Sequence, residues 1–379
     1  MDPALTSDKD KHAPAWKQLL RLVTLITLFN LTCVCVFSTQ LLGVPLYFYD
    51  KQWYYAYISR TKQSFGLICV FITQYFAPTK MVVTGDTDMA GQLRKTEDGR
   101  LSSVFPQRAV VIANHQIYSD WLYIWWLAYT SRLHGAIYII LKDSLKWIPI
   151  AGWAMQFYGF IFMSRKWSHD KPKMLHRLQK LKNPDDPMWL LIFPEGTNYS
   201  PNTTQKSAEF AEKTGQSDLK HLLLPRTTGL HFCLATLDPS IDYIYDLTIG
   251  YSGIQPSVNP FAGIEYTLKS VYGEGKAPKG VHIHVRRIKV KDVPLNDDPK
   301  FEVWLRRVWE EKDELLEYFY TNGHFPTENG EPKVETEVKL GSVLEMFNIF
   351  NVLLAAAAFH FRRSFIQAEK HARDWAQGC

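Results

Sequence analysis

The stretch RAVVIANHQIYSDW, residues 108–121, is the one that decides how the chain folds. Its first half is a short apolar run rich in β-branched residues, which is typical of a buried strand. Its second half starts with polar residues and leads into the aromatic run 121–129, which is long enough to begin a helix. A strand that ends in polar residues and feeds a helix is the repeating unit of an α/β sheet, and functional side chains lie at the carboxyl ends of such strands.

The same alternation extends along the chain and predicts an α/β fold, with a mostly parallel sheet flanked by helices. We expect strands in 109–114, 136–141, 159–164, 188–196, 243–252 and 281–290, the last of them half-exposed, and helices in 119–133, 144–158, 171–183 and 301–320. Residues 85–107 are expected to be a loop insertion, and the polar segment 327–339 a linker. No internal repeat is visible.

Composition narrows the class of protein. Aromatic residues make up 14% of the 379 residues and charged residues only 21%, a mixture that suits a globular body pressed against a membrane. The formal net charge of +5 is compatible with anionic lipid head groups or phosphorylated ligands and argues against a nucleic-acid partner. Five cysteines, at 33, 35, 69, 233 and 379, form no disulfide framework and no zinc site.

Apolar runs near both ends indicate contact with a membrane. Residues 19–47 carry one charge, Arg21, and are long enough to span a bilayer, so we interpret them as an uncleaved anchor, with a cleaved signal peptide as the rival. The run 64–78 is short for a crossing and is expected to pair with the first as a hairpin or to lie in the interface. The run 343–361 favours a transmembrane or interfacial helix over a core helix.

These boundaries predict four segments. Residues 1–80 would hold the N-terminal tail and the membrane-anchoring helices, and residues 81–260 the catalytic domain. Residues 331–379 would form a linker with a C-terminal membrane or interfacial helix. The assignment of residues 261–330 to a C-terminal extension of the catalytic domain is what the family resemblance described below implies.

His115 and Asp120 are the candidate catalytic pair. On one ideal helix, residues five apart differ by about 140° in direction and do not face each other. If His115 lies in the loop and Asp120 begins the helix, the carboxylate can reach the imidazole Nδ1 and fix its tautomer. Asp120 could cap the helix at the same time. Ser119 is the alternative nucleophile, although a cap or a hydrogen bond to Asp120 suits its position better.

The segment NHQIYSD resembles the NHxxxxD motif of the membrane-bound glycerolipid acyltransferases, the superfamily of glycerol-3-phosphate and 1-acylglycerol-3-phosphate acyltransferases. Three further blocks of that superfamily follow in order: GFIFMSR, FPEGTN and LLLPRTTG. Residues 20–330 are similar to the subgroup of lysocardiolipin and lysophosphatidylinositol acyltransferases. The positions that match are Asn114, His115, Asp120, Arg165, Glu195, Gly196, Thr197, Pro225 and Arg226, whereas Ser164 and Asn198 stand where many members have other residues.

The resemblance implies transfer of an acyl chain from acyl-CoA to the free hydroxyl of a lysophospholipid. His115 would take the hydroxyl proton, and Asp120 would stabilise the imidazolium, without a covalent enzyme intermediate. Acyl-CoA is then a co-substrate, and neither a permanent cofactor nor a metal is expected.

The remaining matched residues are expected to bind substrate. Arg165, with Thr197 and the amides beside Gly196, would hold the lipid phosphate. Glu195 would orient Arg165 or the glycerol hydroxyl. Backbone amides near Asn114 or Gly196 are candidate donors to the oxyanion. Pro225 and Arg226, from the fourth block, are the last two of the residues expected to bind substrate.

Remodelling of phosphatidylinositol or cardiolipin is the favoured function, and phosphatidic acid synthesis from 1-acylglycerol-3-phosphate is the alternative. An esterase would need a nucleophile, and no G-x-S-x-G motif is present; a non-catalytic lipid-binding protein is a remote alternative. The sequons at Asn198 and Asn202 adjoin the site, where a glycan would obstruct the lipid. We therefore expect an integral protein of the endoplasmic reticulum or another endomembrane, with the catalytic domain facing the cytosol.

Overall fold

One eight-stranded sheet forms the centre of the molecule, in the order β10-β1-β9-β8-β4-β7-β5-β6. The computed structural model describes residues 14–328, 330–350 and 362. The strands are β1 Lys80–Gly85, β4 Arg108–Ala113, β5 Ile137–Lys142, β6 Ile161–Met163, β7 Met188–Ile192, β8 Tyr243–Tyr251, β9 Val281–Lys289 and β10 Lys333–Glu337. Neighbouring strands are parallel except in the pairs β8–β9 and β1–β10. The mostly parallel α/β sheet expected from the sequence is therefore confirmed.

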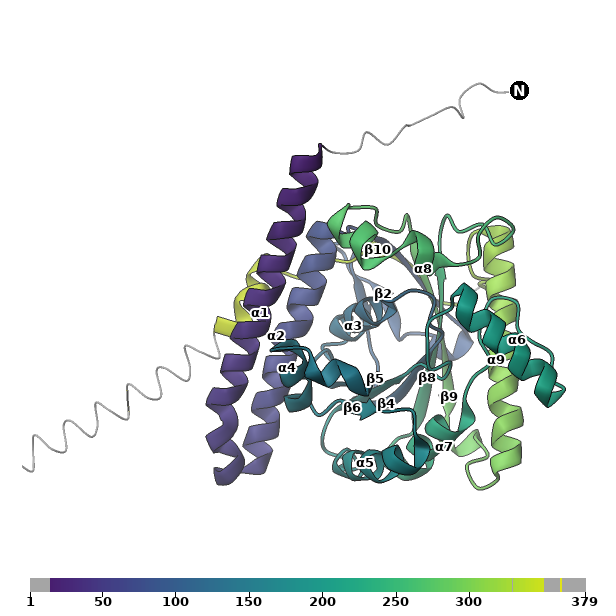
Figure 1. The fold of residues 1–379 in the computed structure, drawn as a ribbon, viewed down its shortest axis with the longest axis horizontal. Coiled ribbons are helices and arrows are strands. Elements are labelled where there is room, and N and C mark those ends of the chain that lie inside the picture. The colour runs from purple at the N-terminus through teal and green to yellow at the C-terminus, as the bar shows by residue number, and fades with distance from the viewer. Residues whose placement is uncertain (1–13, 329, 351–361, 363–379) are drawn as a thin grey trace, which may run out of the picture.

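Helices cover both faces of this sheet (Figure 1). They are α1 Ala15–Tyr49, α2 Lys51–Phe76, α3 Asp120–Thr130, α4 Ala151–Phe157, α5 Trp167–Lys180, α6 Pro201–Thr214, α7 Thr227–Leu237, α8 Ala262–Glu265 and α9 Asp298–Asn322. Alternate residues of β4 face opposite cores, because side chains on a strand alternate in direction. Val111 belongs to the core with Trp125 of α3, and Val110 to the core with Trp309 of α9. The central strand is thus buried on both faces, which explains its unbroken apolar sequence.

The first two helices form a hairpin along one flank of the body (Figure 1). Asp50 ends α1 in an extended conformation and caps α2, because its carboxylate accepts hydrogen bonds from the amides of Gln52 and Trp53 at 2.7 and 3.1 Å. The hydroxyl of Tyr57 ties the two helices together by donating to the carbonyl of Thr39 at 2.7 Å. Of the two interpretations of the second apolar run, the hairpin is confirmed, although the helix already begins at residue 51.

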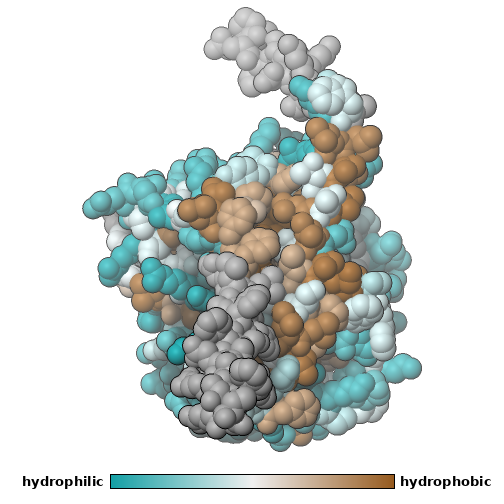
Figure 2. Space-filling view, turned by 90° about the vertical axis from the view of Figure 1, so that its left-hand side faces the viewer, coloured by the Kyte–Doolittle hydropathy of each residue, from teal (hydrophilic) through white to brown (hydrophobic). Residues whose placement is uncertain are grey.

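By length and composition, α1 is the one helix among the described residues that could cross a membrane. Only 17% of its most apolar window is buried inside the molecule, so the helix is not a core helix. Hydrophobic residues form a band along this flank (Figure 2). The helix expected over 343–361 is described only as far as residue 350, and in that part Val343–Phe347 form a short 3-10 helix, η6. The rest of the expected helix, residues 351–361, lies outside the described residues.

Two segments expected to be irregular contain strands. Residues 85–107 include the 3-10 turn η2 (Thr87–Met89) and a small hairpin of β2 (Leu93–Lys95) and β3 (Leu101–Ser103), so the prediction of a plain loop was wrong. The expected linker 327–339 contains β10, which pairs antiparallel with β1 at the edge of the sheet. An edge strand has one exposed side and needs few apolar residues. The charged sequence of β10 therefore did not show the apolar pattern by which the other strands were predicted.

Two element predictions needed correction. Residues 144–158 do not form one helix: Pro149 separates the 3-10 turn η3 (Asp143–Trp147) from α4, because proline cannot donate the helical hydrogen bond. The first half of β9 is buried on both faces rather than half-exposed. Its residues His282 and His284 are covered by the rings of Phe319 and Phe325. β1, α6 and α7 were not predicted.

The division into four segments stays a prediction, and the sheet passes through all of them. β1 begins at the boundary of the first segment, β9 lies in the third and β10 in the fourth. Strands from all parts of the chain therefore share one hydrogen-bonded layer.

Candidate active site

His115 and Asp120 meet where β4 ends and α3 begins. Imidazole Nδ1 of His115 lies 2.8 Å from Oδ2 of Asp120, which is the first residue of α3. The His115 side chain is 18% exposed, whereas Asp120 is completely buried. The loop between strand and helix thus lets the two side chains meet, as the geometric argument required.

Asp120 is held from three directions. Its Oδ2 also accepts a hydrogen bond from the backbone amide of Ile117 at 3.0 Å, and its Oδ1 accepts one from the hydroxyl of Tyr251 at the end of β8. Burial and the charge of Asp120 raise the pKa of Tyr251 well above its usual value, so the phenol keeps the proton that it donates. Both carboxylate oxygens therefore have fixed partners.

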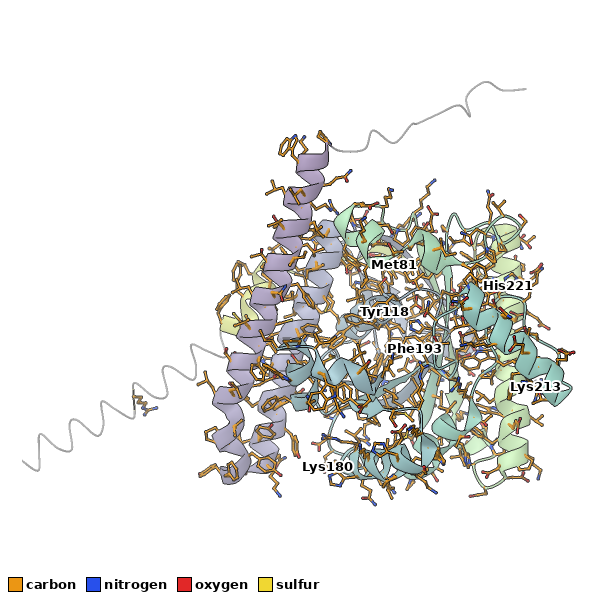
Figure 3. All side chains as sticks on the ribbon, in the orientation of Figure 1. Met81, Tyr118, Lys180, Phe193, Lys213 and His221 are labelled. Atoms are coloured by element: carbon orange, nitrogen blue, oxygen red, sulfur yellow. The ribbon has the colours of Figure 1, made fainter. Side chains whose placement is uncertain are left out.

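Aromatic and acidic groups from the turn after β7 surround His115. The Phe193 ring is stacked on the imidazole, with ring centroids 4.3 Å apart and an interplanar angle of 23°. Phe193 and Tyr118 both lie near the centre of the view in Figure 3, and the Tyr118 side chain is exposed to solvent there. Oε1 of Glu195 accepts a long hydrogen bond, 3.4 Å, from the backbone amide of His115. The carbonyl of His115 in turn accepts a bond of 2.7 Å from the amide of Tyr199. The loop that carries His115 is thus held against the turn after β7.

Glu195 is buried, with 2% of its surface exposed, and its Oε2 has no hydrogen-bond partner among the described residues. Burial raises the pKa of Glu195 to about 8, which favours the protonated carboxyl near neutral pH. Of the two roles expected for Glu195, the structure does not show a bond to Arg165, whose Nη2 donates instead to the carbonyl of Gly196 at 2.9 Å; orientation of the glycerol hydroxyl stays a prediction.

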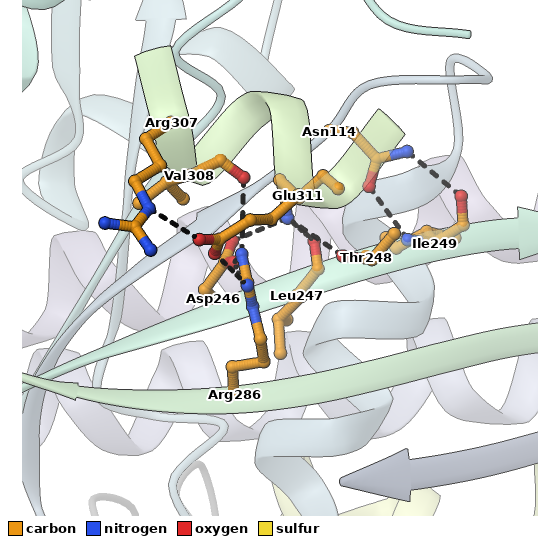
Figure 4. A network of polar contacts seen from close by, with 10 residues as sticks. Asn114, Asp246, Leu247, Thr248, Ile249, Arg286, Arg307, Val308 and Glu311 are labelled. Atoms are coloured by element: carbon orange, nitrogen blue, oxygen red, sulfur yellow. Dashed lines mark hydrogen bonds and ion pairs between the residues drawn. The ribbon is translucent and has the colours of Figure 1, made fainter. Parts of the chain in front are cut away.

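Asn114 is fully buried and bonds to the sheet. Its Nδ2 donates to the carbonyl of Ile249 at 3.0 Å, and its Oδ1 accepts from the amide of Ile249 at 2.8 Å. The side chain therefore anchors the end of β4 to β8, and the right-hand part of Figure 4 shows this pair of bonds.

Two exposed arginines converge on the turn at Gly196. Arg165 follows β6 and bonds to the Gly196 carbonyl, and Nε of Arg226 lies 3.4 Å from the point where a Cβ on Gly196 would stand. Gly196 has a positive φ of 72°, which suits glycine. Pro225 precedes Arg226, whose backbone amide donates to the carbonyl of Pro194 at 2.8 Å. The structure thus brings two guanidinium groups to the turn that carries Glu195.

Other expected roles fit the geometry less well. The Gly196 amide donates to the carbonyl of Phe193 at 2.9 Å, so it is already used within the turn and does not serve as an oxyanion donor in this geometry. Thr197 is half-buried beside it. Ser119 occupies the cap position of α3 but makes no capping bond, and its hydroxyl has no described partner. With 1% of Ser119 exposed, substrate cannot reach that hydroxyl.

A buried ionic network fixes β8 behind the site (Figure 4). Nζ of Lys312, on α9, donates to Oδ1 of Asp246 at 2.5 Å and to the carbonyl of Leu247 at 2.6 Å. Arg286 of β9 donates to Oδ2 of Asp246 at 2.7 Å and to Glu311 at 2.6 Å. Burial opposes ionisation of Asp246, but Lys312 and Arg286 hold its pKa below the usual range. Burial also lowers the pKa of Lys312 to about 8.

The sequence analysis missed Tyr251, Phe193 as a ring partner, and Lys312. Tyr251 lies 131 residues from Asp120 in the chain, and no local pattern marks it. Phe193 stands within the FPEGTN block and could have been suspected from that block alone. The ionic network could have been suspected from Lys312 alone. A lysine on the apolar face of an amphipathic helix is rarely buried unless a charged partner lies opposite it.

Within residues 14–328, 330–350 and 362, no three His, Cys, Asp or Glu side chains come together to hold a metal ion. Cys33, Cys35, Cys69 and Cys233 are all free thiols.

Comparison with known proteins identifies the family. The model of the family Acyltransferase matches residues 95–252, which include the whole His115–Asp120 loop and both arginines, and the model Acyltransferase C-terminus matches residues 274–349. The chain is 40% identical over 304 residues to the 2-acyl-1-lysophosphatidylinositol acyltransferase of Saccharomyces cerevisiae, covering 71% of this chain and 76% of the relative.

The chain belongs to the glycerolipid acyltransferase superfamily.

Two further relatives of this acyltransferase have more distant sequences. It is 33% identical over 305 residues to lysocardiolipin acyltransferase 1 of Gallus gallus, covering 79% of this chain and 74% of the relative. It is 30% identical over 339 residues to lysophosphatidylinositol acyltransferase 10 of Caenorhabditis elegans, covering 85% and 79%. The resemblance found in the four sequence blocks is therefore confirmed, and the acyltransferase is an enzyme that forms esters.

Proposed function

We propose that this acyltransferase transfers a fatty acyl chain from acyl-CoA to the free hydroxyl of a lysophospholipid, of the lysophosphatidylinositol or lysocardiolipin type. The observation that carries the proposal is the His115–Asp120 pair at 2.8 Å, with a buried carboxylate and a partly exposed imidazole. The names of the relatives support the class of acceptor.

The proposed reaction is a direct acyl transfer. With Nδ1 engaged by Asp120, Nε2 of His115 takes the proton of the lysophospholipid hydroxyl while its oxygen attacks the thioester carbonyl. The new C–O bond forms, the C–S bond breaks, and the proton passes from His115 to the leaving thiolate of coenzyme A. Asp120 stabilises the imidazolium between these two steps. The inaccessible hydroxyl of Ser119 supports a route without an acyl-enzyme intermediate.

Arg165 and Arg226 bind the lipid phosphate in this proposal. Both are exposed, both lie beside the Gly196 turn, and guanidinium groups bind phosphate through paired N–H donors. Thr197 contributes its hydroxyl from the same turn. We assign Asn114 and Glu195 to positioning, because Asn114 bonds only to β8 and Glu195 bonds to the backbone of His115.

The alternative acceptor is 1-acylglycerol-3-phosphate, which would make the product phosphatidic acid. It carries the same phosphate and hydroxyl chemistry, so the assay must include it beside lysophosphatidylinositol and monolysocardiolipin. No metal or bound cofactor takes part in the proposed reaction, and acyl-CoA enters as a co-substrate.

We further propose an endomembrane location, such as the endoplasmic reticulum, with the site facing the cytosol. Asn198 and Asn202 lie in the turn and helix start directly after Glu195 and Gly196, where a glycan would block the lipid. A shift in gel mobility after glycosidase treatment of the native membrane protein would contradict this orientation.

The test is an acyl-CoA assay on membranes that contain wild-type protein or His115→Ala, with a panel of lysolipids. We expect His115→Ala to lose activity by a factor of about 10² to 10⁴, the usual contribution of a general base. His176→Ala, at an exposed histidine of α5, is the matched control and should retain full activity. Equal activity of His115→Ala and wild type would refute the mechanism.

A further inference from the structure

A second apolar surface lies between β5 and β6, outside the catalytic pair. The turn η3 and helix α4 expose Trp147 (69%), Ile148 (43%) and Trp153 (42%). Large apolar side chains that are exposed together indicate a surface that binds another apolar surface. None of the steps proposed above uses them.

This surface is continuous with α1. The ring of Trp153 lies 5.5 Å from that of Phe37, and Nε2 of Gln40 donates to the carbonyl of Ala154 at 3.3 Å. On α1, Val34, Leu41 and Leu42 near this contact are themselves exposed. The outward face of α1 and the exposed residues of η3 and α4 therefore form one apolar surface, which we call the α1–α4 face.

The packing of α1 against the body determines how this face can meet a membrane. Arg21 donates to the carbonyl of Tyr272 at 3.2 Å, and Gln40 bonds to α4, so the body touches α1 at points 19 residues apart, from 21 to 40. At 1.5 Å per residue this is about 28 Å, close to the ~30 Å thickness of the hydrocarbon layer.

If α1 crossed the bilayer upright, the flank of the catalytic body between these two contacts would lie inside the hydrocarbon. Polar groups at that depth cost several kcal/mol each unless protein covers them. If α1 instead lies along one leaflet, its exposed apolar side is buried in lipid and the catalytic body stays in water. The position of α1 along one flank of the body permits this orientation (Figures 1 and 2).

We propose that η3 and α4 are a second membrane contact, which inserts Trp147, Ile148 and Trp153 into the same leaflet as α1. Tryptophan favours the boundary between head groups and acyl chains. The exposed ammonium of Lys142, at the start of η3, suits lipid phosphates there. The occupant of the α1–α4 face is thus a phospholipid surface.

The place of this contact in the sheet gives it a role. η3 follows the carboxyl end of β5 and packs against β6, which leads into Arg165. Since β4, β5 and β6 are parallel to β7, their carboxyl ends lie at one edge of the sheet. A lysophospholipid held in the leaflet at η3 therefore lies beside the arginine proposed to bind its phosphate. This last step rests on the proposed function.

The direct test is photo-crosslinking of the full-length protein in vesicles of phosphatidylcholine and phosphatidylinositol. p-Benzoylphenylalanine replaces Trp147, with Leu42 of α1 as the positive control and Val303, equally exposed on the distant helix α9, as the negative control. We expect phospholipid adducts at 147 and 42 but none at 303. Adducts at 42 alone, or crosslinks from 147 to residues 351–379 instead of lipid, would overturn the proposal.

A kinetic test separates lipid delivery from chemistry. We expect Trp147→Ser with Ile148→Ser to raise the KM for a long-chain lysophospholipid in vesicles about tenfold with little change in kcat. The KM for a short-chain, water-soluble lysolipid should not change, and Val303→Ser should behave as wild type. An unchanged KM for the vesicle substrate would refute the role in delivery. Crosslinking needs no turnover, so its result does not depend on whether acyl transfer is the reaction.

Discussion

At the scale of single residues, the site depends on side chains that hold others in place. His115 is the one member of the proposed catalytic pair that reaches the surface, and Asp120, Tyr251, Glu195 and Asn114 are all buried behind it. Buried polar groups with fixed partners limit the motion of the groups that they contact, because leaving them unpaired costs free energy.

Tyr251 is predicted to position Asp120. Tyr251→Phe removes one hydrogen bond to a buried carboxylate, a loss of about 1.5–3 kcal/mol, so we expect kcat to fall by a factor of about 10 to 100 with little change in KM.

The matched control is Tyr123→Phe. Tyr123 is also fully buried and its ring lies 6.3 Å from the Tyr251 ring, but its hydroxyl makes no hydrogen bond to Asp120. If the two variants lose the same activity, the loss comes from altered packing and not from the bond to Asp120.

Glu195 is predicted to act in its protonated form. Because its folded pKa of about 8 lies above that of an unfolded glutamate, the folded state holds the extra proton, and stability decreases as the pH rises from about 4.5 to 8. Glu195→Gln removes this loss, so the variant should be more stable than wild type at pH 8 by on the order of 4 kcal/mol, since the rise of the pKa from 4.5 to about 8, at about 1.4 kcal/mol for each pH unit, is almost fully expressed at that pH.

Activity provides the decisive measurement for Glu195. Glu195→Gln should keep activity within a few-fold of wild type at pH 7 and retain it above pH 8, where wild type declines. Glu314→Gln, at an exposed position of α9, should leave both profiles unchanged. A large loss of activity of Glu195→Gln at pH 7 would show that the ionised carboxylate is required.

At the scale of elements, α9 is fastened to the sheet by a buried ion pair as well as by apolar packing. Lys312 and Asp246 are both completely buried, and Arg286 shares the carboxylate. The network holds β8, whose residues Ile249 and Tyr251 bond to Asn114 and Asp120. A helix from the C-terminal part of the chain thus supports, through one strand, the loop that carries the proposed catalytic pair.

Lys312→Met is predicted to destabilise the protein by about 3 kcal/mol, because it removes one partner of a buried charge. Lys300→Met, which breaks an exposed pair at 2.9 Å, should cost less than about 0.5 kcal/mol. The measurement is thermal or denaturant unfolding in detergent. Adding Asp246→Asn to Lys312→Met should recover part of the loss, and equal effects of the two lysine substitutions would contradict the argument.

At the scale of the whole molecule, the segments predicted from the sequence share one core. Phe301, Leu305, Trp309, Leu316 and Phe319 of α9 are buried with residues of β4 and α7. At about 1.5–3 kcal/mol each, these five side chains contribute roughly 10 kcal/mol, which is comparable to the whole stability of a typical domain.

A chain that ends at residue 260 is therefore predicted not to fold, although it contains every residue of the proposed site. A chain that ends at residue 328 loses the edge strand β10 but keeps β9 and α9, and it should retain most of its helix content and its protease resistance. Circular dichroism and limited proteolysis in detergent compare the two. A folded, active 1–260 fragment would show that the extension is dispensable.

Much of this protein followed from the sequence alone. The strands predicted directly before His115, Arg165 and Glu195 are confirmed. Buried parallel strands need continuous apolar runs, and such runs are visible in any single sequence. The pairing of His115 with Asp120 was also predictable, since five residues across a strand-to-helix junction set their separation. The family followed from four short blocks in order.

Only the tertiary structure decided the rest. β10 and the hairpin of β2 and β3 are stabilised by pairing with distant strands or with each other, so their own composition did not reveal them. Tyr251, Lys312 and the partners of Arg165 and Glu195 depend on contacts between segments far apart in the chain. Which side chain fits such a contact depends on the space and the charge that the other segment presents. The sequence pattern around either residue contains no information about that space or charge, so the contact could not be predicted from it.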